Sequence, residues 1–345
     1  MKRLLILSAV IVVSSCGCDE PAHRDLTGPA GEDVPYLALV AALRSGQPPL
    51  QALAAETFME TDRRPPIQDV EALANARDPR VRTTAVALLG TMRQHASIPL
   101  FQRKLRDADP AVQLTAHFAL AMTGEPARVT GLRDGLASPN VALRRTAAWL
   151  LGLIGNRTAV GLLKVKLNDP DAVVVLRAAE AMHRLGSKEG LERVRTLTGH
   201  ERHQIRYYAT RLLGRMGDES DIPRLGRLCQ SRFLDVKFAA IAALAQRGDL
   251  KRIGMLLDLA EVPEPDTRVV AIRELGETGY TPAIERLAKL LHSRLPLERT
   301  AAAASILRIR SAGAFWRTKI LVDQPAGTTP PVPPTPLPSR RPSGR

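Results

Sequence analysis

The chain has 345 residues, enough for two ordinary domains or one extended array of repeats. Hydrophobic residues make up 45% of it but aromatic residues only 3%, so the core must consist of Leu, Ala, Val and Ile, which favours helices over sandwiches or barrels. Three cysteines exclude a disulfide framework, and the net charge of +14 points to nucleic acid, an anionic membrane or an acidic partner, unless it reflects an arginine-rich proteome.

The N-terminus reads as a targeting segment. Two basic residues precede the apolar run LLILSAVIVV (4–13), which is too short to span a bilayer as a mature helix. The following VSSC (13–16) resembles a bacterial lipobox, in which the cysteine is lipidated and becomes the first residue. We therefore expect a lipoprotein signal peptide over 1–15, lipidation at Cys16 and a polar tether over 16–34. The alternative is an ordinary secretory signal in which this cysteine is accidental.

From residue 35 to residue 322 the sequence repeats with a period of 31 residues. Alanine occupies every position at this spacing, namely Ala54, Ala85, Ala116, Ala147, Ala178, Ala209, Ala240, Ala271 and Ala302. The registers of Leu89, Ile98 and Phe101 stay apolar from unit to unit, and a glycine recurs at the register of Gly124. Self-similarity without insertions is the signature of a repeat array.

Each unit is predicted to hold two helices. In the first, apolar residues at 81, 85, 88, 89 and 92 share one helical face, and the recurring glycine ends the helix in the left-handed conformation. The second helix carries apolar residues at 98, 101 and 105. Asp-Pro pairs, as at 78–79, mark the turn into the next unit. The repeated alanine lets two helix backbones approach closely, where a larger side chain would push them apart.

The segments DPRVRTTAVALLGTM (78–92) and SPNVALRRTAAWLLGLIG (138–155) resemble short HEAT-like repeats of the phycobilisome lyase type. The resemblance covers about 36–322. It implies an all-α fold, a right-handed α-solenoid of about nine two-helix units, in which each unit touches only its neighbours. The ends should carry caps, with 311–322 closing the last unit. The Pro-rich segment 323–345 is predicted to be a disordered tail.

The resemblance also offers two enzymatic chemistries. A branch similar to deoxyhypusine hydroxylase binds iron through His-Glu pairs in the first helix, but those registers hold other residues here, such as Thr83-Thr84. The pair His200-Glu201 falls in a turn between units. The lyase branch attaches bilins to partner proteins, and nothing in the sequence specifies a bilin. Cys229 occupies an apolar register and reads as a buried hydrophobe. We therefore predict no catalytic residue, no metal and no cofactor.

A basic residue recurs at one register, at Arg82, Arg144, Arg206, Lys237, Arg268 and Arg299. It looks like a ladder for a ligand. The structural interpretation is favoured: each arginine bonds its turn or an acid one helical turn earlier, as Asp78 could with Arg82.

Two surfaces remain as candidate binding sites. Apolar side chains at two registers of the first helices form a possible exposed line, the apolar line, comprising Leu114, Phe118, Trp149, Leu176, Tyr207 and Phe238. The alternative is that they pack between units. Basic side chains on the second helices form a possible strip, the basic strip, comprising Arg103, Arg133, Lys164, Arg195 and Arg227. Its alternative is an ordinary solvated face, interrupted by acids such as Asp134.

These features predict an exported, lipid-anchored scaffold that faces the periplasm and binds a protein partner through its stacked surface. The second interpretation is a binder of an anionic envelope partner, such as phospholipid, lipopolysaccharide or another polymer. An enzyme of the lyase or hydroxylase branch is the third. Nucleic acid is not expected as a partner, because export conflicts with it and few aromatic residues are available to stack on bases.

Overall fold

The computed structural model describes residues 33–323, with side chains described as far as Ser311. Regular structure within this range is helical throughout, which confirms the predicted all-α fold. The α-helices are α1 (Val34–Leu43), α2 (Pro48–Glu60), α3 (Ile67–Leu73), α4 (Pro79–Thr91), α5 (Ile98–Lys104), α6 (Pro110–Met122), α7 (Val129–Ala137), α8 (Val141–Ile154), α9 (Ala159–Val165), α10 (Ala172–Arg184), α11 (Leu191–Leu197), α12 (His203–Met216), α13 (Ile222–Leu228), α14 (Leu234–Ala245), α15 (Ile253–Leu259), α16 (Pro265–Thr278), α17 (Ala283–Leu290) and α18 (Pro296–Asp323). Short 3-10 turns precede α5, α7 and α13, and another follows α9.

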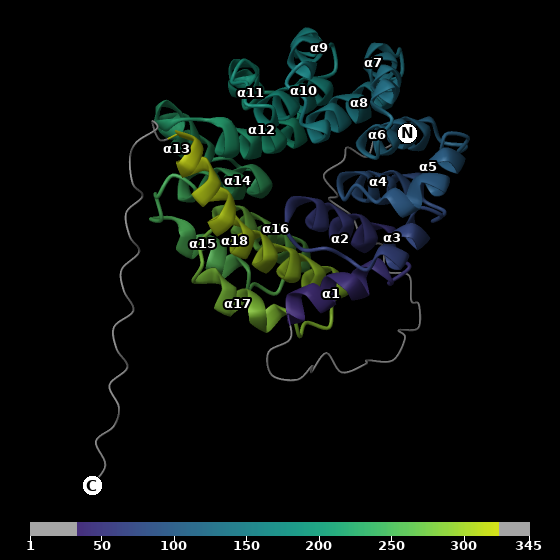
Figure 1. The fold of residues 1–345 in the computed structure, drawn as a ribbon. Helices are drawn as coiled ribbons and strands as arrows, with labels where there is room; N and C mark the ends of the chain where they lie inside the picture. Colours follow the sequence, from purple (N-terminus) through teal and green to yellow (C-terminus); the bar gives the residue numbers. More distant parts are fainter. Residues whose placement is uncertain (1–32, 324–345) are drawn as a thin grey trace, which may run out of the picture.

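The helices form two layers (Figure 1). Each even-numbered helix packs against the even-numbered helices before and after it, from α2 through to α18, and these helices make the inner layer. The odd-numbered helices lie outside, and each packs on its even-numbered neighbour, as α5 does on α6. One inner and one outer helix form each repeating unit, so the predicted two-helix organisation is confirmed.

The two ends of the array meet. Helix α18 packs against α16, as expected, but also against α1 and α2 at the other end of the chain. Across this seam the guanidinium of Arg308 donates to a carboxylate oxygen of Glu60 at 2.7 Å, and that of Arg310 donates to Asp33 at 3.1 Å. The expectation that each unit touches only its neighbours along the chain is therefore wrong for the first and last units. The small rotation between successive units brings the last one back to the first, and the two ends cover each other.

Close packing in the inner layer depends on small residues. All nine repeated alanines are fully buried, at 0% exposure. A Cβ atom built on Gly152 of α8 would lie 2.8 Å from the Cα of Ala181 in α10, which leaves no space for a side chain. Gly90, Gly214 and Gly276 meet the next inner helix in the same way. Glycine thus allows close approach at every second interface between inner helices, while the repeated alanine is buried in every unit.

Most helix ends follow the predicted rules. The recurring glycine adopts the left-handed conformation at Gly124, Gly155, Gly186, Gly248 and Gly279. Gly217 differs, because its φ of −70° is ordinary. There a Cβ atom would lie 2.6 Å from the carbonyl oxygen of Leu213, so glycine is required by space rather than by conformation. At the helix starts, Asp78 and Asp109 accept backbone N–H bonds as N-caps.

The repeated arginine joins neighbouring units. Arg82 donates to the carbonyl oxygens of Ala76 and Arg77 at 2.9 Å, and its guanidinium also pairs with Asp107 at 2.7–3.0 Å. Four further arginines each donate to a carbonyl oxygen of the turn before their own helix, namely Arg144, Arg206, Arg268 and Arg299. The structural interpretation is confirmed for these arginines, with one correction. The acid follows the next outer helix for Arg82 and Arg144 and is Glu298 of α18 for Arg268, while Asp78 caps α4.

None of the described helices is both long enough and apolar enough to cross a bilayer. The predicted signal peptide, the proposed lipidation site Cys16 and nearly all of the predicted tether and tail lie outside the described residues.

Candidate functional site

The inner helices direct a cluster of charged side chains toward one another inside the closed array. We call it the central network; its members are Glu60, Glu180, Arg211, Arg215, Glu277 and Arg308. Glu277 of α16 is its main acceptor, since it pairs with Arg211 and receives two further bonds from Arg215, at 2.7 and 3.1 Å. Arg215 also reaches Glu180 of α10 at 3.5 Å. The network therefore links α10, α12 and α16 across the interior.

Burial and charge act in opposite directions on these carboxyl groups. Burial alone would raise the pKa of Glu180, but the guanidiniums of Arg184, Arg177 and Arg215 outweigh it and lower that pKa to about 2. Burial likewise opposes ionisation of Glu277, and Arg211 with Arg215 again outweighs it, so its pKa lies well below the usual range. Both groups are carboxylates at neutral pH and depend on their arginine partners.

Two tyrosines complete the interior. Tyr208 donates its hydroxyl to Glu180 at 2.6 Å, and Tyr207 donates to Glu274 at 2.7 Å. Glu274 is fully buried, and this burial raises its pKa. Its nearest cation is Arg211, whose Nε lies 3.4 Å from Oε1. Both carboxyl groups are buried, but the pKa of Glu180 is lowered whereas the pKa of Glu274 is raised.

The central network leaves little room for a ligand. The space beside Arg211, Gln246 and Glu277 has no volume for a water-sized molecule. The donors and acceptors of the central network pair mainly with each other. The network therefore holds the inner helices together rather than presenting a binding site. Sequence reasoning did not identify it. The available signal was a charged residue that recurs at one register of the inner helices, as in Arg215, Glu277 and Arg308, which are spaced by multiples of 31 residues.

The apolar line is not an exposed surface. Leu114, Phe118, Leu176, Tyr207 and Phe238 are all buried, and Trp149 is partly buried against the main core. Leu114 packs against Gly135 of the adjoining outer helix α7, and Phe118 packs against Gly90 of α4. The expected exposed line is therefore wrong, and the alternative of packing between units is confirmed for these five side chains. The registers of Leu114 and Phe118 therefore face adjoining helices.

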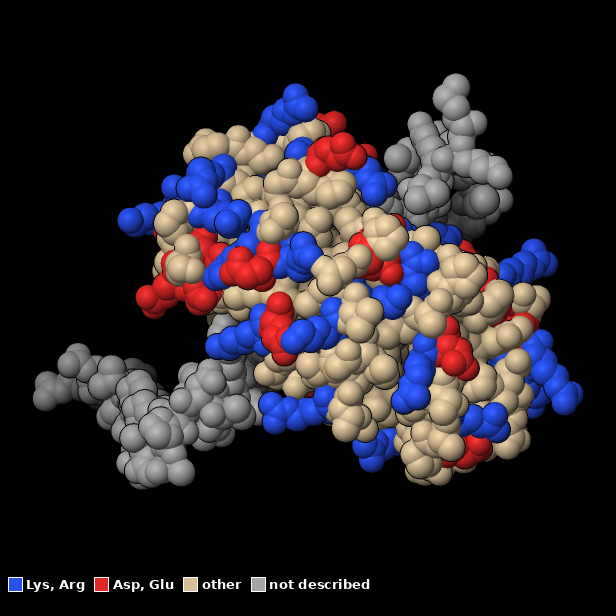
Figure 2. All heavy atoms as spheres, turned by 90° about the horizontal axis from the view of Figure 1, so that it is seen from above, with Lys and Arg blue, Asp and Glu red and all other residues tan. Residues whose placement is uncertain are grey.

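The basic strip lies on consecutive outer helices, from α5 to α13. Arg103, Arg133 and Arg227 are exposed, and none of them forms an ion pair with another described residue. Lys164 is also exposed but pairs with Glu189 at 2.7 Å. Figure 2 shows that Lys and Arg side chains are spread over the face seen there, with Asp and Glu between them. Three members of the strip therefore keep an uncompensated positive charge.

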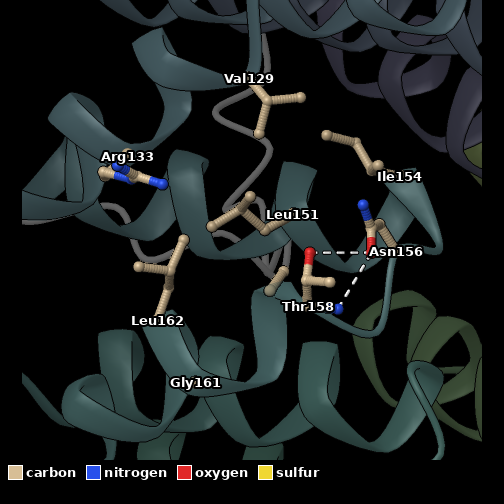
Figure 3. A pocket seen from close by; sticks show the side chains of 9 residues that line it. Val129, Arg133, Leu151, Ile154, Asn156, Thr158, Gly161 and Leu162 are labelled. Carbon is tan, nitrogen blue, oxygen red and sulfur yellow. Dashed lines mark hydrogen bonds between the residues drawn. The ribbon is translucent and has the colours of Figure 1, made fainter. Parts of the chain in front are cut away.

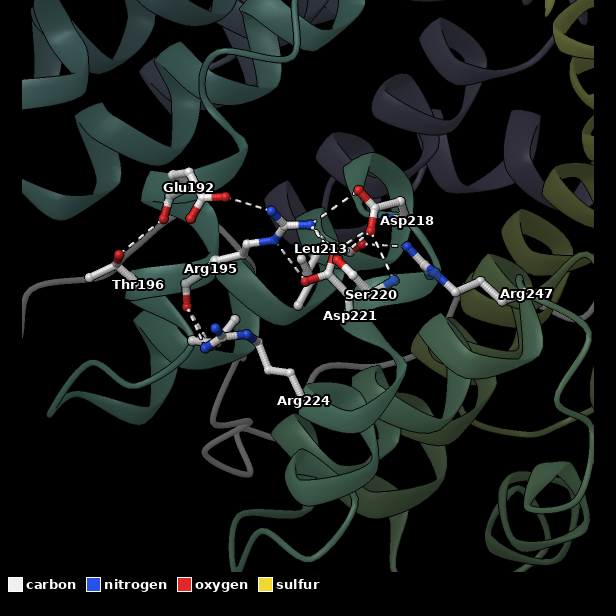
Figure 4. A network of polar contacts seen from close by, with 10 residues as sticks. Glu192, Arg195, Thr196, Leu213, Asp218, Ser220, Asp221, Arg224 and Arg247 are labelled. Atoms are coloured by element: carbon white, nitrogen blue, oxygen red, sulfur yellow. Dashed lines mark hydrogen bonds and ion pairs between the residues drawn. The ribbon is translucent and has the colours of Figure 1, made fainter.

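Arg195 does not belong to a free basic surface. Figure 4 shows its guanidinium between Glu192 on one side and Asp218 with Asp221 on the other. Both contacts with Asp221 measure 2.8 Å, and the hydrogen bond with this residue is the main reason that the pKa of Arg195 is raised. The prediction that Arg195 faces an anionic partner is wrong, because this arginine joins α11 to the turn before α13.

A pocket of about 290 Å³ lies beside the strip, between the outer helices α7 and α9 and above α8. Figure 3 shows Arg133 at one side, Asn156 with Thr158 at the other, and Leu151 between them. The hydroxyl and backbone N–H of Thr158 both donate to Asn156 Oδ1, at 2.9 and 3.0 Å. The remaining wall is formed by Val129, Ile154, Ala159, Gly161 and Leu162. The pocket is thus apolar, with donors at its edges.

The HEAT-repeat family matches this sequence over residues 67–145 and 129–206. Residues 67–206 of this chain carry HEAT repeats. No protein with a curated description matches it. Among solved structures, the CpcE–CpcF complex of phycocyanin lyase from Nostoc sp. PCC7120 is similar with 18% identity, covering 71% of this chain and 96% of that one, at a TM-score of 0.39. YibA of Escherichia coli has 15% identity, coverages of 69% and 91%, and a TM-score of 0.39.

Human deoxyhypusine hydroxylase in complex with glycerol is a third similar structure, with 16% identity, coverages of 71% and 96%, and a TM-score of 0.31. Two of these three structures are of enzymes, but similarity at this level does not extend to the chemistry of this HEAT-repeat protein. Its own residues decide that question.

Residues considered for catalysis or metal binding lie apart in the HEAT array. Cys229 is buried, as predicted, and burial raises the pKa of its thiol, which disfavours the reactive thiolate. His200 and Glu201 lie in the turn between α11 and α12, as expected, where the Nδ1 of His200 accepts the backbone N–H of Arg202 at 3.1 Å. Within residues 33–311, three or more potential metal ligands do not come together.

Proposed function

We propose that this HEAT-repeat protein is an exported, lipid-anchored scaffold that binds an acidic protein partner on its outer face without catalysing a reaction. One observation carries the proposal. The inner face is occupied by its own ion pairs, whereas Arg103, Arg133 and Arg227 on the outer face have no ion pair within the described residues. A partner with carboxylates can compensate these three charges.

The outer face also suits a protein better than a small substrate. The three free arginines stand on α5, α7 and α13, so one partner must span several units to reach them. Electrostatic complementarity over such an area contributes specificity and association rate more than raw affinity. The attachment half of the proposal rests on VSSC (13–16), with Cys16 carrying the lipid and the array facing the periplasm.

A capture experiment tests the binding half. The triple variant Arg103→Glu, Arg133→Glu and Arg227→Glu should lose the partner that crosslinks to wild type in cells and is then identified by mass spectrometry. A matched control reverses three exposed cations outside the strip, Arg77, Lys251 and Arg294, with the same change in net charge. Capture that falls equally in both triples would show a general charge effect and would contradict a specific site.

An anionic envelope polymer is the second candidate, because the same three arginines would bind it. The two candidates differ in the captured molecule: a stoichiometric protein supports the first, and phospholipid or lipopolysaccharide supports the second. In both cases binding should weaken as salt rises, since exposed charges are screened within about 10 Å at 0.1 M salt.

The attachment half has its own test. Labelled fatty acid should enter the wild-type protein and not Cys16→Ala. Equal labelling of both, or of neither, would contradict the lipoprotein assignment and leave the binding proposal untouched.

A further inference from the structure

We propose that the pocket between α7 and α9 is the specificity pocket for the partner: it binds an apolar side chain that stands next to a carboxylate, and Arg133 pairs with that carboxylate. This inference rests on the proposed function, because it describes how the acidic partner is recognised. Its evidence is the composition, volume and charge of the pocket, which the basic strip alone does not explain.

The walls favour an apolar group. Leu151 forms the floor and is buried, while Val129, Ile154 and Leu162 are partly buried around it. The volume of about 290 Å³ lies just below the range of roughly 300–1,000 Å³ typical of small-molecule sites. It suits a side chain with its attached polar group rather than a large cofactor. Burying an aliphatic side chain there would contribute about 25 cal/mol per Å² of apolar surface.

The edges favour a carboxylate. Arg133 is exposed and has no ion pair within the described residues, and none of the residues lining the pocket carries a negative charge. On the opposite side, Asn156 Oδ1 is already used by Thr158, which leaves the Asn156 amide N–H groups as the free donors. A guanidinium and an amide donor across an apolar floor complement a ligand that carries acceptors and negative charge.

Gly161 is the residue that keeps the pocket open. A Cβ atom built on it meets nothing within 4 Å, and its backbone is ordinary helix. The units before and after carry Thr130 and Glu192 at the same register, where a side chain occupies this side of the helix. Glycine inside an exposed helix costs up to about 1 kcal/mol relative to alanine. Glycine at position 161 therefore leaves the pocket open at a cost in helix stability.

The chain supplies matched variants. Gly161→Phe adds a side chain at the pocket, where the new Cβ meets nothing within 4 Å. Gly254→Phe in α15 is its control, because Gly254 is also helical with nothing within 4 Å of an added Cβ. Arg133→Gln removes the cation, and Lys289→Gln in α17 removes another exposed cation, which lies outside the basic strip and does not line the pocket. All four changes lie on the outer helices, so folding can be checked by the same thermal melt.

The probes are N-acetyl-leucine, which carries a main-chain carboxylate, acetyl-glutamyl-leucinamide, which carries a side-chain carboxylate, and N-acetyl-leucinamide, which is neutral. Ligand-observed NMR on the full chain measures each Kd. We expect millimolar binding of at least one acidic probe, weakened about tenfold by Arg133→Gln and by Gly161→Phe, with both controls unchanged. Tighter binding of N-acetyl-leucine would indicate that the partner presents its C-terminus. Tighter binding of acetyl-glutamyl-leucinamide would indicate an internal acidic segment.

Equal binding of the neutral probe, or unchanged binding in Gly161→Phe, would overturn the pocket assignment. The outcome is separable from that of the proposed function. If the triple charge variant loses its protein partner while no probe binds, the pocket inference fails and the outer-face proposal stands. If the probes bind as expected but the triple variant keeps its partner, the outer-face proposal fails.

Discussion

Replacing Glu277 by glutamine tests the central network at its main acceptor. The change is nearly isosteric, and it removes the one charge that pairs with both Arg211 and Arg215. The side chain of Glu277 is only 8% exposed, so water cannot take over this role. Breaking a buried ion pair costs about 3–5 kcal/mol, because the remaining charge stays buried without compensation. The amide keeps one acceptor oxygen, so we expect a loss near the lower end, about 3 kcal/mol.

Urea and thermal melts followed by circular dichroism give the measurement. Glu285→Gln is the matched control, because Glu285 is exposed on α17 and has no ion pair among the described residues. Surface changes of this kind usually shift stability by less than about 0.5 kcal/mol. The reasoning is refuted if the two variants melt together, since the interior carboxylate would then contribute no more than a solvated one.

Three other outcomes are expected. Gly152→Val should destabilise the fold by roughly 1–3 kcal/mol, because its Cβ would lie 2.8 Å from Ala181; an unchanged urea midpoint would remove the close-approach account. Phe118→Ala should cost about 3–5 kcal/mol of stability, whereas lost partner capture with unchanged stability would restore the apolar line. Because the pKa of Glu180 is about 2 when folded, its stabilisation is present above about pH 4.5 and lost as pH falls toward 2; acid melts of Glu180→Gln should show a smaller loss over this range.

The repeat organisation could be predicted because it is local and reiterated. Ala178 and Ala147 share a register and are both fully buried, so one register predicts every unit. The glycines that end the inner helices were predictable for the same reason. Gly217 is the exception, because glycine is needed there to avoid neighbouring atoms that the repeat does not specify. Closure was not predictable, because it sums small rotations over all the units and no single unit encodes it.

The site was predicted only in part for the same physical reason. Arg103, Arg133 and Arg227 were identified from their register on the second helices, and exposure there is a local property. Arg195 has the same register as Arg133, but its pairing with Asp221 depends on the following unit. The exposure of Phe118 was misjudged, because its surroundings depend on how neighbouring inner helices pack.

The central claim is that the array closes on itself and so leaves only its outer face for a partner. Hydrogen exchange in Arg308→Glu tests it, because this reversal repels Glu60 across the seam, 248 residues away in sequence. Closure predicts faster exchange in α1 and α2 as well as in α16, with protection restored when Glu60→Arg is added. Faster exchange confined to α16 and α17, with α1 and α2 unchanged and no effect of the second change, would contradict a closed array.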